Sequence, residues 1–131
     1  MFAGEVDLKT WFKPKIDKKT LKELSKRSDI KGLLDISVFI VALILSGYLC
    51  IISWGSLWSI PALLLYGNIF YCKIISIQHE TNHETYFKTR ALNKFFYHIT
   101  SLLGGFEAVR WKWSHFHHHT YTIFTHEEVY D

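Results

Sequence analysis

The feature that most constrains this chain is a run of 37 consecutive residues, 36–72, that contains no Asp, Glu, Lys or Arg. A helix of that length would measure about 55 Å, which is more than a soluble core needs and about enough to cross a 30 Å hydrocarbon layer twice. Trp, Gly and Ser residues at 54–59, followed by Pro61, divide the run. The sequence therefore predicts two membrane-spanning helices, at 34–53 and 60–78, joined as a hairpin.

The charges that flank this hairpin predict its orientation. Residues 1–35 contain nine Lys and Arg, residues 73–131 contain six, and the turn contains none. Basic residues collect on the cytoplasmic side of membrane proteins, so we expect both termini in the cytoplasm. Lysines placed directly before an apolar span argue against a nucleic-acid partner. An apolar content of 49% excludes disorder, and two cysteines are too few for a disulfide scaffold.

The expected fold class is an all-α integral membrane protein: one transmembrane hairpin plus cytoplasmic or interfacial helices that carry histidines. Three regions follow from the pattern: a cytoplasmic segment at 1–33 with a short amphipathic helix at 20–25, the hairpin at 34–78, and cytoplasmic or interfacial helices at 79–131. Within the last region, apolar residues at helical spacing predict an interfacial helix at 87–103, and a further helix from about 107 through the histidine-rich stretch.

Five of the eight histidines form two sets with helical spacing. The first set is spaced i, i+4 and the second i, i+3, i+4, so each set shares one face of a helix. Imidazoles gathered in one small region are costly to desolvate unless a metal uses their lone pairs. The candidate ligands are His79, His83, His115, His118 and His119. The other three, expected to be ordinary interfacial or hydrogen-bonded side chains, are His98, His117 and His126.

Two metal chemistries compete for these histidines. Residues 79–83 satisfy the H-E-x-x-H pattern, in which two histidines bind zinc and the glutamate, here Glu80, acts as general base of a protease. A single catalytic zinc takes three protein ligands, however, and five imidazoles over-supply it. They suit a pair of metals, and imidazole is compatible with iron.

At these residues the sequence resembles the membrane-bound fatty acid desaturase family. The resemblance extends over 24–122 and includes the hairpin, the first histidine box at 79–83, the connecting segment at 87–93 and the second box in 115–122. It implies that the five candidate histidines are ligands of two non-haem iron ions. The implied reaction uses dioxygen as co-substrate and removes two hydrogens from adjacent carbons of an acyl chain.

The resemblance also implies the partners. They are an acyl lipid, acyl-CoA or acyl-carrier substrate, membrane lipid, and a separate electron-transfer protein as the external electron donor. The family has three histidine boxes and usually four spans, whereas two of each are present up to Asp131. We therefore expect the N-terminal portion of a desaturase-like enzyme, which alone would be inactive.

Several alternatives stay open at this point. A lipid or carotenoid hydroxylase or ketolase could use the same ligands, and the less favoured possibilities are a membrane zinc protease and a non-catalytic metal-binding hairpin. Glu80, Asn82 and Glu84 either orient imidazoles or are solvated helix residues. Trp111 and Trp113 either line the path of the acyl chain or anchor the protein at the interface.

Overall fold

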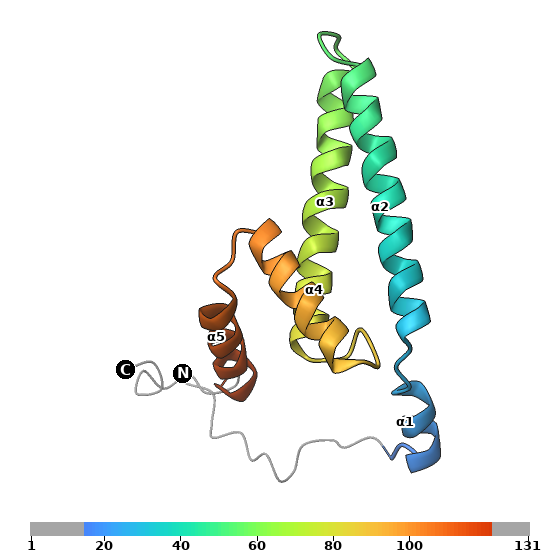
Figure 1. The fold of residues 1–131 in the computed structure, drawn as a ribbon, viewed down its shortest axis with the longest axis vertical. Helices are drawn as coiled ribbons and strands as arrows, with labels where there is room; N and C mark the ends of the chain where they lie inside the picture. The colour runs from blue at the N-terminus through green and yellow to red at the C-terminus, as the bar shows by residue number, and fades with distance from the viewer. Residues whose placement is uncertain (1–14, 122–131) are drawn as a thin grey trace, which may run out of the picture.

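The computed structural model describes residues 15–121, and its regular elements in that range are all helices (Figure 1). The expectation of an all-α chain is therefore confirmed for the part that the structure describes. The helices are α1 (Lys18–Leu24), α2 (Asp29–Ile52), α3 (Ser59–Asn82), α4 (Arg90–Leu103) and α5 (Ala108–Tyr121).

The two longest helices, α2 and α3, run side by side in opposite directions and form a hairpin (Figure 1). Each has 24 residues and is long and apolar enough to cross a membrane, and only 11% and 17% of their most apolar stretches are buried. α2 begins at Asp29, earlier than expected, because the Ser28 side chain accepts a hydrogen bond from the backbone N–H of Lys31 and caps the helix. α3 continues past the expected end to Asn82, which places His79 inside its last turn.

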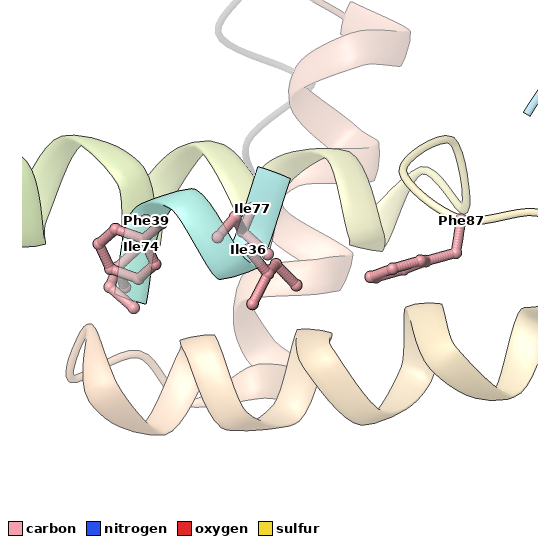
Figure 2. Packing of buried hydrophobic residues seen from close by; sticks show 5 residues of the cluster. All are labelled: Ile36, Phe39, Ile74, Ile77 and Phe87. Atoms are coloured by element: carbon pink, nitrogen blue, oxygen red, sulfur yellow. The ribbon is translucent and has the colours of Figure 1, made fainter. Parts of the chain in front are cut away.

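The hydrophobic core lies at the end of the hairpin away from the turn (Figure 2). Figure 2 shows its five buried side chains, which come from α2, α3 and the connection after α3: Ile36, Phe39, Ile74, Ile77 and Phe87. The ring of Phe87 is fully buried and stacks on Phe96 of α4 at 5.1 Å between centroids. It also requires Gly32 on α2, since a Cβ there would lie 2.6 Å from a ring carbon of Phe87.

Polar side chains fasten the connection between α3 and α4 to the rest of the chain. The buried amide of Asn93 accepts from the N–H of Phe87 (3.0 Å) and donates to its carbonyl (2.9 Å). The carboxylate of Asp29 accepts from the N–H and the hydroxyl of Thr89, both at 2.8 Å. The connection is therefore held both by Asn93 of α4 and by Asp29 at the start of α2.

α4 packs along the lower part of α3 and presents its polar side there (Figure 1). Its buried residues are Asn93, Tyr97, Thr100 and Ser101, and they face the buried Gln78 and Thr81 of α3. The large apolar side chains of α4 are instead exposed: Phe95, Ile99, Leu102 and Leu103. The helix is thus amphipathic as expected. Its polar side packs on α3, Leu92 and Phe96 pack against the hydrophobic core, and the rest of its large apolar side chains are exposed.

Candidate metal centre

The first histidine pair lies where α3 ends. His79 is in the last turn of α3, and His83 is the residue that caps it, with its N–H bonded to the carbonyl of His79. The two ring centroids are 4.8 Å apart, as i, i+4 spacing on one helical face requires. The end of an apolar helix therefore carries two imidazoles pointing the same way.

The second pair comes from α5, which lies beside α4 (Figure 1). Glu107 starts this helix by accepting hydrogen bonds from the N–H groups of Val109 and Arg110. About two turns later, His115 and His119 share a face, with ring centroids 4.5 Å apart. That face meets the first pair.

Four imidazoles converge at this point, two from each helix: His79, His83, His115 and His119. One nitrogen from each ring can be chosen so that all four lie within 4.8 Å of one another. The Nε2 of His115 is 3.0 Å from the Nε2 of His83 and 3.0 Å from the Nε2 of His119. The structure thus gathers segments that are 32 residues apart in the sequence.

These separations fit a bound metal ion. Two imidazole nitrogens that bind one first-row ion at about 2.1 Å and at a right angle lie about 3.0 Å apart. A neutral imidazole nitrogen carries either a hydrogen or a lone pair, so the Nε2 of His115 cannot make two good hydrogen bonds of the same kind at once. Lone pairs directed at a shared ion would account for both contacts, and a donor set of nitrogens alone suits a first-row transition metal.

Electrostatics keeps this site ready for a cation. Burial, followed by repulsion from His79, His119, His83 and His118, lowers the pKa of His115 to about 4. Burial, followed by repulsion from His79 and His119, also holds the pKa of His83 below its ordinary value. Both rings are therefore neutral at pH 7, and no proton has to leave before they bind a metal.

The fifth candidate ligand, His118, lies next to this group but outside it. Its ring centroid is 6.1 Å from that of His115 and 5.7 Å from that of His119. His117 points elsewhere and stacks on Tyr121. His98 lies on α4, away from both pairs in the sequence, and its ring contacts Tyr97. His126 lies outside the described residues.

The neighbours that the sequence leaves open as orienting groups for the imidazoles, Glu80, Asn82 and Glu84, differ in their contacts. The carboxylate of Glu84 pairs with Arg90 at 3.2 Å, and Glu84 adopts a positive φ of 55° in the turn after α3. The carbonyl of Glu80 accepts hydrogen bonds that close the same turn. The side-chain oxygen of Asn82 is buried without a hydrogen-bond partner.

One residue at the site was not singled out from the sequence as a contact of a histidine. The indole of Trp111 stacks on the imidazole of His115, with centroids 4.5 Å apart and planes 12° apart. It also meets His79 edge-on at 6.3 Å. The i, i+4 spacing of Trp111 and His115 was the signal that could have revealed this contact.

The comparison with protein families agrees with this geometry. The family model described as fatty acid desaturase matches residues 52–131, which is more than half of the chain and includes both histidine pairs. The chain belongs to the fatty acid desaturase family. The matched range leaves out most of α2, so the part of the resemblance that was expected before residue 52 lies outside it. No curated protein and no solved structure matches the chain.

Family membership indicates the class of activity. A fatty acid desaturase family domain indicates a lipid-modifying oxidoreductase, and the family is associated with membranes and generally uses a di-iron centre. A lipid substrate and an electron-transfer partner are general features of the family. The four converging imidazoles are the part of this chain that matches such chemistry.

Proposed function

We propose that this chain carries the first two histidine ligand groups of a membrane-bound di-iron fatty acid desaturase. The observation that supports the proposal most strongly is the convergence of imidazoles from two segments at one end of an apolar hairpin. The two iron ions supply the oxidising power, with dioxygen as co-substrate, that breaking unactivated C–H bonds of an acyl chain requires. The residues of this chain hold and orient them.

The imidazoles divide between two ion positions in this proposal. His79, His83, His115 and His119 surround one position, because their nitrogens lie within 4.8 Å of one another. His118, beside this group, is assigned to the second ion. A second ion needs more ligands than one histidine, so we infer that the rest come from outside residues 15–121.

The surrounding helices support a position of this centre at a membrane surface. α2 and α3 expose most of their large apolar side chains between residues 30 and 71, and the basic residues lie at the end opposite the turn, so that end is assigned to the cytoplasm. The outward apolar side of α4, with Phe95, Ile99, Leu102 and Leu103, would then rest against the acyl layer. An acyl chain leaving that layer would meet the histidines within a short distance of the interface.

The test uses the full-length gene product expressed in membranes. We expect iron that co-purifies with the protein and new double bonds in the fatty acids of the host, measured by metal analysis and mass spectrometry of the lipids. His79→Ala should remove both, whereas His117→Ala, an exposed histidine on α5, should remove neither. Hydroxylated or keto products would instead assign a related oxygenase activity, and iron-independent peptide cleavage would contradict the proposal.

A further inference from the structure

α5 presents a structural problem, because it carries half of the histidine cluster without a buried residue of its own. α4 has the same length, 14 residues, and buries four side chains against its neighbours. A helix without buried residues has little packing to fix its position. Something other than a hydrophobic core must keep His115 and His119 facing α3.

Trp111 of α5 has ring neighbours on α3, on α4 and in the connection before α5. It stacks on His115 of its own helix and meets His79 of α3 edge-on. Its ring is also 6.4 Å from Tyr97 of α4 and 6.3 Å from Phe106 in the connection before α5. One indole therefore contacts three helices at the point where the imidazoles converge.

Tyr97 of α4 fixes the start of α5 close to Trp111. It is 6% exposed, and its hydroxyl donates a hydrogen bond to the carbonyl of Ala108, the first residue of α5. Ala108 precedes Trp111 by three residues, which is less than one turn. This hydrogen bond fixes the start of α5 to the well-packed α4. The indole of Trp111, less than one turn further along α5, then reaches the imidazole of His115.

We propose that Trp111 is a positioning residue, whose stacked indole holds the His115 imidazole in the orientation that metal binding requires. The inference rests on the proposed function, since it concerns the same centre. A flat ring packed parallel to an imidazole restricts rotation about its Cβ–Cγ bond, so the nitrogen is aimed before the ion arrives. Removing such an outer partner of a metal ligand typically costs about 10- to 100-fold in metal affinity.

The test measures binding of Co²⁺ to the full 131-residue chain in detergent micelles, by visible absorbance. Co²⁺ follows Fe²⁺ in the order of metal affinities and has a ligand-field spectrum that reports its coordination. Trp111→Ala should weaken Co²⁺ binding about tenfold, and Trp111→Phe should restore it to within about threefold, because a benzene ring still stacks. Trp111→Leu keeps apolar bulk without a ring and should not restore it.

A matched control lies two residues away on the same helix. Trp113 is 62% exposed and its ring contacts Phe116, so Trp113→Ala should leave the affinity for Co²⁺ unchanged within about twofold. A second readout is fluorescence. Co²⁺ bound beside His115 should quench the emission of Trp111, so Trp111→Phe should lose the quenched component and Trp113→Phe should keep it.

The outcomes separate this inference from the proposed function. If the natural chain binds no Co²⁺ in a manner that depends on His115, the proposed function fails. If the natural chain binds Co²⁺ and Trp111→Ala binds it equally well, the positioning role is overturned. Restoration by Trp111→Leu as complete as by Trp111→Phe would also overturn it, because bulk alone would then suffice.

Discussion

Helices α4 and α5 have the same length, 14 residues each, but they are held in place by different forces. α4 buries Asn93, Tyr97, Thr100 and Ser101, so packing and hydrogen bonds fix it against α3. α5 buries none, and its contacts with the rest of the chain include ring contacts and the hydrogen bond between Tyr97 and Ala108. One side of the site is therefore fixed by buried packing, and the other side is held by ring contacts and by the hydrogen bond from Tyr97.

The largest loss of metal affinity is expected when His115 is replaced, because its Nε2 is 3.0 Å from two other imidazole nitrogens. His115→Ala should lower the affinity for Co²⁺ by more than about 100-fold, beyond the cost of losing an outer partner. Titration followed by absorbance measures this loss. His117→Ala serves as the control on the same helix and should bind Co²⁺ like the natural chain; an equal loss in both variants would show that the shared face was assigned wrongly.

The second largest effect is a loss of stability where α4 is packed against the rest of the chain. Asn93→Leu leaves the buried N–H and carbonyl of Phe87 without their partners, which should lower the free energy of unfolding by about 2–4 kcal/mol. Thermal unfolding in detergent measures this change. The same substitution at the exposed Asn68 of α3 is the control and should have little effect. Equal stability of the two variants would mean that the connection is not fastened by Asn93.

A smaller loss of stability is expected at the close contact between Gly32 of α2 and Phe87. Gly32→Ala places a Cβ 2.6 Å from the ring of Phe87, and overpacking of this kind costs about 1–3 kcal/mol. Gly67→Ala, in α3, meets nothing within 4 Å and should be neutral or stabilise the helix by about 0.5–1 kcal/mol. Unfolding curves of the two variants should therefore shift in opposite directions or differ clearly. A stable Gly32→Ala protein would contradict this account of the core.

The smallest effect is a dependence on pH in the docking of α5, which α4 should not share. In the folded chain the pKa of His115 is about 4, below its ordinary value of 6.5, so the docked helix disfavours the protonated ring. In the metal-free chain, docking of α5 should be complete above pH 6.5, weaken as the pH falls toward 4, and change no further below that value. Trp111 fluorescence should follow this change in the natural chain and not in His115→Ala. Loosening of α4 over the same range would erase the difference between the two helices.

Much of this architecture could be predicted from the sequence because strong patterns encode it. The uncharged run predicted two long helices, and i, i+4 spacing predicted that His79 would face His83 and that His115 would face His119. His118 shows where the pattern is too coarse. A residue at i+3 lies about 60° to one side of the first histidine and a residue at i+4 about 40° to the other, so a centre between i and i+4 leaves i+3 aside.

Other features could not be predicted because they depend on how the helices meet. The periodicity of α4 revealed an apolar side, but it did not reveal that the polar side would pack on α3. The buried contact between Gln78 and Ser101 shows that packing. Trp111 was expected to line an acyl path or to anchor the interface, since an aromatic residue near a membrane surface suits both roles. Its edge-on contact with His79 and its position 6.4 Å from Tyr97 depend on how α5 meets α3 and α4.

In the proposed site, imidazoles from α3 and α5 bind one metal ion together. X-ray absorption spectroscopy of the Co²⁺-loaded chain tests it most directly, because imidazole ligands give a characteristic scattering pattern. We predict four nitrogen donors from imidazoles at about 2.1 Å, and one fewer imidazole in both His79→Ala and His115→Ala. An imidazole count that either substitution leaves unchanged would show that the two helices do not share an ion, and would contradict the claim.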